Sequence, residues 1–360
     1  MKVYSLGHGV IPGDAVTTHM LEIDRRLRAW GLETQVFAEH VAPSFRQVAL
    51  SDVELPPLLT ADEAVLIYHY SIYSPNVRLF RAFQGRKMLV YHNITPGAFF
   101  RRWDPYQAWL CEMGRRALGT LSSCPLALGD SEYNRSELVE AGFAPQRTGV
   151  LPIFVGLDSL DRVEPDGTLL QRLRAGRTVN ILSVGRIVPS KAIEEMIRVF
   201  YVYHRCINPD SRLLLVGSRY LPAYDEQLAA LVHALDIEDA VTMTGSVSPA
   251  RLKTYYLAAD LYLTTSYHEG FCMPLLESMH YGVPILAREA AAIPETLGQA
   301  GVLFARLGHG EVAEMAHLLV TDLNLRSQVV ATQRARLRDF SPGRVEQQLA
   351  AALHQIGILC

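Results

Sequence analysis

Glu269 and Glu277 stand eight positions apart on either side of a glycine and a proline. The glycine suits a tight turn and the proline suits the first turn of a helix. The apolar run 258–265 just before them is typical of a buried strand. Glu269 is therefore expected on the loop that ends this strand, and Glu277 about one turn into the following helix. Backbone N–H groups at such a helix start bind anions such as phosphates. Two acids beside such a turn suit a ligand with hydroxyl and phosphate groups, such as a nucleotide sugar.

A second loop carries positive charge. Gly185, Arg186 and Lys191 directly follow the apolar run 181–184. Gly185 permits a sharp turn, Arg186 offers a planar fork to phosphate oxygens, and Lys191 adds a point charge. The loop lacks the Gly-Lys-Ser/Thr order of a P-loop. Two solvated cations on an ordinary loop are the alternative, but an acidic loop on the same sheet favours a shared phosphate site.

The elements that must position these residues alternate between strand and helix along the whole chain. Such alternation predicts an α/β fold of two doubly wound domains, each with a parallel sheet covered on both faces. Domains are expected at 1–160 and 166–340, joined by a polar linker at 158–166, with a final helix at about 343–360 packing back on the first domain. Ligands bind at the carboxyl ends of such sheets, so a cleft between the two domains is the expected site. Strands are predicted at 3–6, 34–38, 64–68, 87–91, 126–128, 179–184, 212–216, 241–244, 261–265 and 284–287.

Composition excludes several other classes. The 360 residues are 49% hydrophobic and 20% charged, with a net charge of −3, which argues against a disordered or nucleic-acid-binding chain. Neither a signal peptide nor an apolar run of about 20 residues is found, so we expect a cytoplasmic protein. Five scattered cysteines without a CxxC pair argue for a reducing compartment and against a zinc site or disulfides: Cys111, Cys124, Cys206, Cys272 and Cys360.

Together the two loops resemble the retaining glycosyltransferases of family 4, which have the GT-B fold of two Rossmann-like domains. That family pairs a Gly-Arg-x-x-x-x-Lys loop with a Glu-x7-Glu motif, and both are complete here. The segments 12–16, 91–96 and 129–135 resemble a bacterial branch of the same family. The resemblance covers nearly the whole chain.

The resemblance implies a role for each charged residue. Arg186 and Lys191 would bind the donor diphosphate and stabilise it as it leaves. Glu277 would hydrogen-bond the ribose, and Glu269 would hold a hydroxyl of the transferred sugar. Backbone N–H groups beside that sugar would come from Gly270, Phe271 and Cys272.

Further contacts are implied for the rest of the donor. Gly185 would shape the phosphate loop, the turn containing Ser246 and Val247 would hold the base through backbone groups, and Gly13 would approach the diphosphate from the first domain. The family often has glycine or alanine at the position of Cys272, so this larger side chain is expected to narrow the sugar pocket.

His92 follows a predicted strand in a Tyr-His-Asn-Ile-Thr-Pro loop. The resemblance implies that it contacts the donor sugar or the acceptor, and the alternative is a loop histidine bonded to backbone. For His69 a structural role is at least equally favoured. Asp130 and Ser131 are expected to cap the helix that starts near Asn134.

The implied chemistry needs no metal. The chain has no Asp-x-Asp motif, which metal-dependent transferases use to hold a cation, so Arg186 and Lys191 would replace it. We therefore expect metal-independent transfer with retention, and no cofactor. A glycoside hydrolase with paired carboxylates is disfavoured, because Glu277 is expected at the ribose.

Basic and aromatic residues interleave within 99–116. This segment either rests on a membrane, which would suit a polyprenyl-diphosphate-linked acceptor at the inner face of the cytoplasmic membrane, or packs as an ordinary amphipathic helix. The favoured function is sugar transfer from GDP-mannose, ahead of UDP-sugars, to a saccharide or lipid-linked acceptor in polysaccharide or glycoconjugate assembly. The alternatives are a GT-B sugar-nucleotide epimerase and a non-catalytic nucleotide-sugar-binding subunit.

Overall fold

The computed structural model describes residues 1–60, 62–176 and 178–358. Its contacts divide the chain into two compact units. Unit 1 comprises Met1–Arg101, Pro105–Val155 and the chain from Phe340 onward, and unit 2 comprises Arg102–Asp104 and Gly156–Asp339. Cys360, named among the scattered cysteines, lies outside the described residues.

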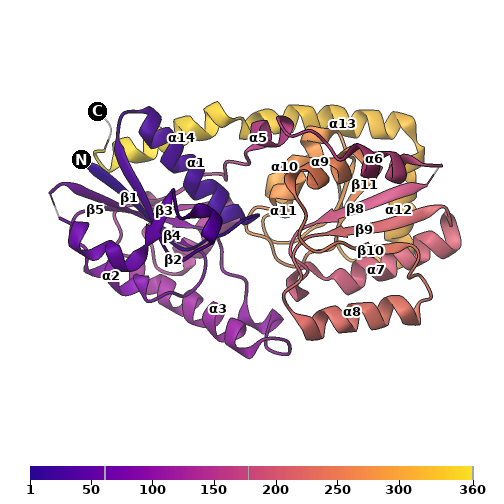
Figure 1. The fold of residues 1–360 in the computed structure, drawn as a ribbon, viewed down its shortest axis with the longest axis horizontal. Coiled ribbons are helices and arrows are strands. Elements are labelled where there is room, and N and C mark those ends of the chain that lie inside the picture. Colours follow the sequence, from indigo (N-terminus) through magenta and orange to yellow (C-terminus); the bar gives the residue numbers. More distant parts are fainter. Residues whose placement is uncertain (61, 177, 359–360) are drawn as a thin grey trace. The chain divides into compact units, whose positions relative to one another are not determined.

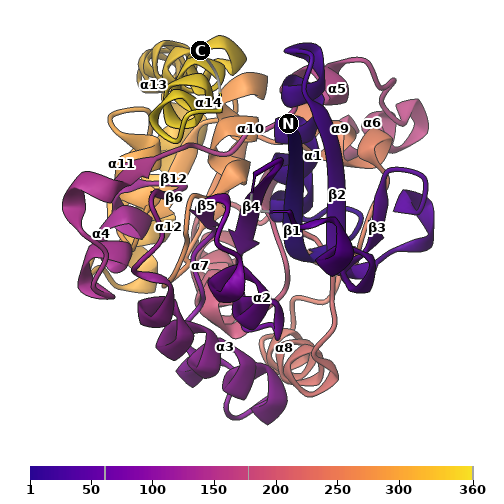
Figure 2. The ribbon, with the colours of Figure 1, turned by 90° about the vertical axis from the view of Figure 1, so that its left-hand side faces the viewer.

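Unit 1 is built on a parallel sheet of seven strands in the order β3-β2-β1-β4-β5-β6-β7, and Figure 2 shows β2, β1, β4 and β5 side by side. The strands β4 and β5 are rich in buried apolar residues, as expected where helices cover both faces of a sheet. The strands are β1 Lys2–Val10, β2 Glu33–Val41, β3 Ala49–Ser51, β4 Ala64–Tyr70, β5 Arg86–Tyr91, β6 Ala127–Gly129 and β7 Thr148–Val150. The helices are α1 Ala15–Ala29, α2 Asn76–Ala82, α3 Pro105–Leu118, α4 Glu132–Glu140 and α14 Pro342–Gln355.

Unit 2 has a parallel sheet of six strands in the order β10-β9-β8-β11-β12-β13. In Figure 1 the strands run between α9 and α10 on one side and α7 and α8 on the other. The strands are β8 Val179–Val184, β9 Ser211–Val216, β10 Val241–Met243, β11 Leu261–Thr264, β12 Ile285–Arg288 and β13 Val302–Phe304. The helices are α5 Leu157–Asp161, α6 Gly167–Arg174, α7 Ile193–Val202, α8 Pro222–Ala234, α9 Pro249–Ala258, α10 Met273–Tyr281, α11 Ile293–Leu297, α12 His309–Thr321 and α13 Leu323–Leu337.

The predicted α/β class with two parallel sheets is confirmed, and every predicted strand is present. Three further strands of three residues each, β3, β7 and β13, were not predicted. The linker expected at 158–166 is wrong in part, because Leu157–Asp161 forms α5. The helix α7 ends at Val202 and continues as a π-helical turn over Tyr203–Ile207.

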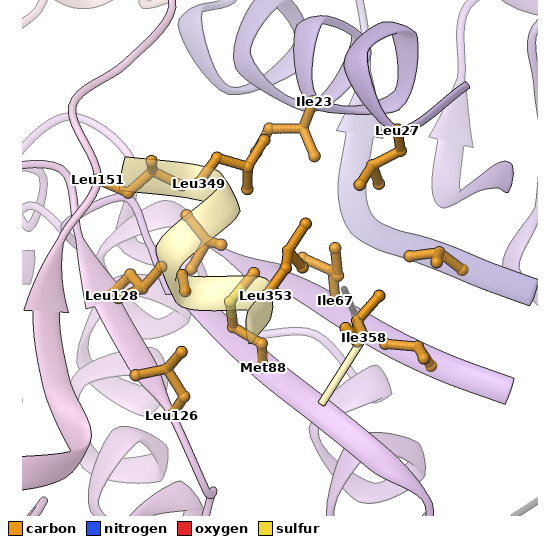
Figure 3. Close-up of a cluster of buried hydrophobic side chains, with 14 of the residues drawn as sticks. Ile23, Leu27, Ile67, Met88, Leu126, Leu128, Leu151, Leu349, Leu353 and Ile358 are labelled. Atoms are coloured by element: carbon orange, nitrogen blue, oxygen red, sulfur yellow. The ribbon is translucent and has the colours of Figure 1, made fainter. Parts of the chain in front are cut away.

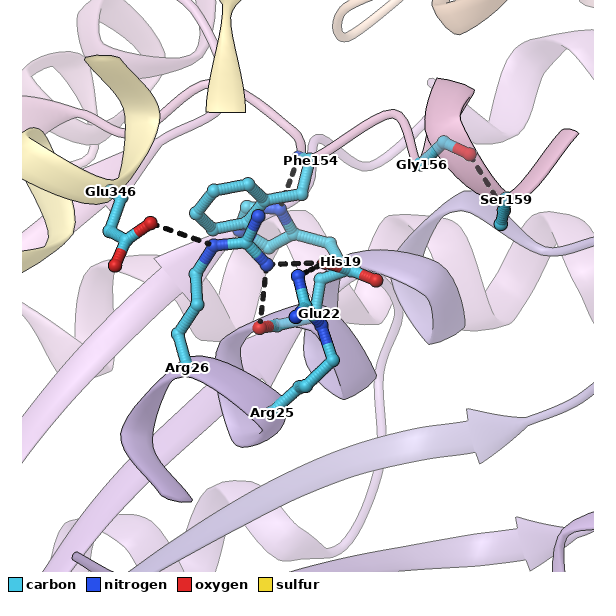
Figure 4. A network of polar contacts seen from close by, with 8 residues as sticks. All are labelled: His19, Glu22, Arg25, Arg26, Phe154, Gly156, Ser159 and Glu346. Carbon is cyan, nitrogen blue, oxygen red and sulfur yellow. Dashed lines mark hydrogen bonds and ion pairs between the residues drawn. The ribbon is translucent and has the colours of Figure 1, made fainter. Parts of the chain in front are cut away.

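The C-terminal helix α14 completes the core of unit 1. Its buried residues Val345, Leu349 and Leu353 lie in one apolar cluster with Ile23 and Leu27 of α1 and with residues of β4 and β5 (Figure 3). A polar network accompanies this packing (Figure 4). The buried Arg26 pairs with Glu22, lies 3.8 Å from Glu346 of α14, and stacks over the ring of Phe154 at 3.7 Å. The end of the chain is thus held to its beginning by apolar and charged contacts.

Candidate functional site

Three glycines at the carboxyl ends of β8, β9 and β10 bring their loops into direct contact. Gly185 follows β8 with φ +145° and donates its N–H to Val216. Gly217 follows β9, and a Cβ there would lie 1.8 Å from the carbonyl oxygen of Gly185. The N–H of Gly217 donates to the carbonyl of Gly245 at 3.2 Å. Glycine is required at Gly217, since any side chain would push away the loop that carries Gly185.

The acidic loop after β11 is bonded to the basic loop after β8. The hydroxyl of Thr265 donates to the carbonyl of Ala192 at 2.9 Å, and the N–H of Tyr267 donates to the carbonyl of Ser190 at 2.9 Å. The carbonyl of Glu269 accepts from Ala292 at 3.1 Å, which fixes the loop from the other side. These bonds explain why two segments about 80 positions apart in sequence form one site.

Lys191 and Glu269 form an ion pair at the centre of this site. The carboxylate of Glu269 is 8% exposed and the side chain of Lys191 22% exposed. A carboxylate this buried needs a partner, because an isolated charge away from water is costly. The two residues predicted from separate motifs therefore meet.

These side chains line one pocket of unit 2. Four predicted site residues lie on its wall, and the guanidinium-bearing Arg186 is exposed at this site. The wall combines two cations, one carboxylate and several hydroxyl groups, which suits a ligand with phosphate and hydroxyl groups. It consists of Ser183, Val184, Gly185, Arg186, Ile187, Lys191, Ile193, Met196, Tyr262, Thr264, Ser266 and Glu269.

Glu277 lies on α10, as predicted, but it is not among the residues that line this pocket. Its carboxylate accepts a hydrogen bond from the hydroxyl of Tyr256 at 2.5 Å. Burial raises the pKa of Glu277 above its usual value, and the bond from Tyr256 opposes that rise. Tyr256 lies on α9 and was not predicted as a site residue, because an aromatic residue in a helix is usually part of the hydrophobic core.

Cys272 is buried directly before α10 with a left-handed φ of +69°. Residues other than glycine adopt this backbone conformation at a cost in free energy. Burial, and then the charge of Glu269, raise the pKa of the Cys272 thiol well above its usual value, so the thiol is neutral. The neighbouring Phe271 carbonyl accepts from Thr296 at 2.7 Å, which holds this strained turn in place.

The turn predicted to hold a base follows β10. Gly245 has φ +69°, and its carbonyl accepts from both Gly217 and the hydroxyl of Thr244. Ser246 is exposed and Val247 is half-buried. The turn is thus bonded, through Gly217, to the loop that carries Gly185.

In unit 1 His92 belongs to a buried chain of polar groups. Its Nδ1 lies 3.1 Å from Asp130 Oδ2 and its Nε2 lies 2.9 Å from His69 Nδ1. The side chains of His92 and Asp130 are each 1% exposed. Both ring nitrogens thus meet side chains, which neither sequence interpretation anticipated. The expectation that Asp130 caps α4 is wrong: Ser131 is the cap, and its hydroxyl accepts from the N–H of Asn134 at 3.2 Å.

A third histidine joins this group. His19 of α1 is fully buried, with its ring centroid 5.4 Å from that of His92, and its Nδ1 accepts from the N–H of Phe154. Burial lowers the pKa of both His19 and His69 well below the usual value. Both rings are therefore neutral at physiological pH.

Gly13 lies between β1 and α1 with φ +72°, and a Cβ there would meet nothing within 4 Å. The next residue, Asp14, caps α1 by accepting from the N–H of Thr17 at 2.9 Å. The glycine therefore sets the direction in which the chain enters the first helix.

The basic and aromatic segment within 99–116 divides between the two units. Tyr106 and Trp109 of α3 are 68% and 48% exposed and stack on one another with centroids 5.9 Å apart. Trp103 instead belongs to unit 2, where its ring lies 5.1 Å from that of Tyr224. Only part of the predicted aromatic group thus faces solvent. None of the described helices is long and apolar enough to cross a membrane.

Both units have the GT-B fold, and solved structures match them along nearly the whole chain. HepE of Anabaena, solved with UDP and glucose, superposes with a TM-score of 0.78 at 18% identity and covers 98% of this chain and 99% of that one. WaaG, a glycosyltransferase involved in lipopolysaccharide biosynthesis, superposes with a TM-score of 0.75 at 14% identity over 99% and 100% of the two chains. The predicted GT-B fold is confirmed.

Within unit 2, residues 171–336 match the family model described as Glycosyl transferases group 1. O-antigen chain mannosyltransferase B of Escherichia coli is 26% identical over 186 residues, 51% of this chain and 48% of that protein. A GDP-mannose-dependent alpha-(1-6)-phosphatidylinositol monomannoside mannosyltransferase of Mycobacterium tuberculosis is 28% identical over 178 residues, 46% of this chain and 44% of that protein. The chain spans about half the length of these curated relatives.

Proposed function

We propose that this protein transfers a sugar from a nucleotide-diphosphate sugar to an acceptor, with retention at the anomeric carbon and without a metal ion. The observation that carries the proposal is the pocket in which Arg186 and Lys191 lie beside Glu269. The pocket belongs to the segment that matches the group 1 glycosyl transferases. The proposal places the chain in the bacterial branch of family 4.

The charges of the pocket fit the demands of the reaction. As the sugar–phosphate bond breaks, positive charge develops on the anomeric carbon and negative charge on the departing diphosphate. Preorganised cations aimed at that negative charge lower the barrier. Arg186 supplies a planar donor fork and Lys191 an ammonium, so the diphosphate would be stabilised without a bound cation.

Lys191 can serve Glu269 and a phosphate at once, because an ammonium group carries three donors. One N–H would hold the Glu269 carboxylate in place for a hydroxyl of the transferred sugar. The others would face the diphosphate. The pair thus positions both ends of the bond that breaks, while the N–H groups of 270–272 face the sugar and the turn at Ser246 and Val247 faces the base.

The proposed donor is GDP-mannose, with UDP-sugars as the next choice. Two relatives are named as mannosyltransferases, one of them GDP-mannose-dependent, whereas HepE was solved with UDP and glucose. The proposed acceptor is a saccharide or a polyprenyl-diphosphate-linked saccharide in polysaccharide or glycoconjugate assembly. The exposed aromatic pair of α3 would rest on the inner face of the cytoplasmic membrane, where a lipid-linked acceptor resides.

The test is release of nucleoside diphosphate from a panel of GDP- and UDP-sugars, with saccharide acceptors and with EDTA present. We expect release with one base, dependent on acceptor, undiminished by EDTA, and an α-linked product from an α-linked donor by NMR. Loss of turnover in EDTA would overturn metal independence, and inversion would overturn retention. Isomerisation of the donor without nucleotide release would identify an epimerase, and binding without turnover a non-catalytic subunit.

A further inference from the structure

A second group of chemically active side chains lies in unit 1. His8 is on β1, and Glu39 and His40 are adjacent on β2. The two strands are parallel neighbours, with Gly9 paired to His40, so His8 lies opposite Glu39 near the carboxyl ends of both strands. The sequence alone does not predict this group, because 31 positions separate His8 from Glu39 and only strand pairing brings them together.

The ligand atoms of the three side chains converge. His8 Nδ1 lies 3.2 Å from Glu39 Oε2, and His40 Nε2 lies 4.0 Å from Glu39 Oε1. One such atom from each residue lies within 4.8 Å of the others. Two ligands bound at about 2.1 Å to one tetrahedral zinc ion lie roughly 3.4 Å apart. The spacing of His8 and Glu39 already meets this requirement, and a small rotation of the exposed His40 would bring in the third.

The side chains of His8 and Glu39 are oriented by neighbouring groups and remain accessible to solvent. The hydroxyl of Ser74 donates to Glu39 Oε2 at 2.8 Å, the kind of outer bond that orients carboxylate ligands of metals. The side chains of His8 and Glu39 are 30% and 31% exposed, so a cation could reach them from solvent.

We propose that His8, Glu39 and His40 bind one divalent transition-metal ion of the zinc class, with water in the remaining coordination position. Two imidazoles and one carboxylate suit Zn²⁺, Co²⁺ or Ni²⁺, whereas Mg²⁺ and Ca²⁺ prefer sites made of oxygen atoms alone. The bound ion would join β1 to β2 at their carboxyl ends. None of the three residues lines the pocket of unit 2, so the proposal does not depend on the proposed function. It departs from the sequence expectation that the chain has no metal site.

The test is isothermal titration of tag-free, chelator-treated protein with Zn²⁺. We expect one ion per chain, and at least a tenfold weaker affinity in each of His8→Ala, Glu39→Gln and His40→Ala. His233→Ala is the matched control, because His233 pairs with Glu238 on the surface of unit 2 and lies in no three-residue cluster found among the described residues. Its affinity for Zn²⁺ should equal that of the unaltered protein.

Two further measurements distinguish loss of the metal site from loss of the fold. Thermal unfolding in EDTA shows whether each variant is folded, and His40→Ala alone carries the test if the others are not, since His40 is 64% exposed. The strong visible absorption of four-coordinate Co²⁺ reports a protein site of the proposed geometry and should disappear in His40→Ala. Zn²⁺ binding that is absent, or that is unchanged in all three variants, would overturn the proposal.

Discussion

Cys272 shows how one residue can be held in a costly conformation next to a charged pair. Its φ of +69° is a region that glycine enters freely and β-branched residues hardly at all. The bonds from Ala292 to Glu269 and from Thr296 to Phe271 hold the chain just before Cys272 in place. The same turn places the Glu269 side chain against Lys191. The left-handed turn and the ion pair thus lie on one loop.

We predict that two substitutions of Cys272 differ in their effect on stability. Cys272→Gly removes about 1 kcal/mol of backbone strain and loses a small buried side chain, so the free energy of unfolding should change by no more than about 1 kcal/mol. Cys272→Val places a β-branched residue at positive φ and should lower the free energy of unfolding by about 2 kcal/mol or more. Urea denaturation measures both. Equal stability of the two variants would show that the left-handed turn is not retained in solution.

At the scale of elements, the loops after β8, β9 and β10 depend on one another through glycine contacts. Gly217 has no room for a side chain against Gly185. We predict that Gly217→Ala lowers the free energy of unfolding by more than about 2 kcal/mol and weakens nucleotide binding, because the loop with Arg186 must move. Gly310→Ala is the control, since a Cβ at that position in α12 meets nothing within 4 Å. Chemical denaturation and a nucleotide titration measure the stability and the nucleotide affinity of both variants. Equal values for Gly217→Ala and Gly310→Ala would contradict the close contact between Gly217 and Gly185.

The helix α3 presents a second prediction at this scale. Tyr106 and Trp109 stack together on its exposed side, and Arg116 near its end is exposed as well. If this side rests on a membrane, the double variant Tyr106→Ala/Trp109→Ala should float with anionic liposomes several-fold less than the unaltered protein, with little change in stability. Leu323→Ala, which removes an apolar side chain that is 76% exposed on α13, should float normally. Flotation that is absent from all three proteins would discard the membrane contact.

For the molecule as a whole, the buried histidines tie stability to pH. The pKa of His19 and His69 is well below the usual value in the folded protein and returns to about 6.5 on unfolding. Above that pH both states are neutral and nothing changes. Below it the unfolded chain takes up protons that the folded chain does not, so stability falls as pH decreases, by up to about 1.4 kcal/mol per pH unit for each ring.

The prediction is checked by urea denaturation at several pH values between 7.5 and 5. The groups next to these rings are His92 and Arg26, and His92 in turn contacts Asp130, whose pKa is raised by burial. His69→Gln should reduce the steepness of the decline, whereas His233→Gln, which alters an exposed side chain, should leave it unchanged. A decline that is equally steep in His69→Gln would show that His69 does not titrate in this way.

The sequence predicts more of the fold than of the candidate site. Alternating periodicity predicts the two sheets, and two spaced motifs predict that Lys191 and Glu269 share a site. Tyr256, Gly217 and the His19–His69–His92 group could not be found this way, because each is defined by contacts between distant segments. His92 could be placed after its strand, but its partners Asp130 and His69 come from neighbouring strands that only the folded sheet brings together.

The cations of the pocket are proposed to stabilise a departing diphosphate, and kcat for donor turnover by Arg186→Ala measures that contribution. Arg186 is exposed, so its removal should leave the thermal midpoint unchanged while kcat falls about 10²- to 10³-fold. Arg205→Ala removes another exposed arginine of unit 2, one that pairs with Asp236, and should retain full activity. Undiminished turnover by folded Arg186→Ala enzyme would contradict the account.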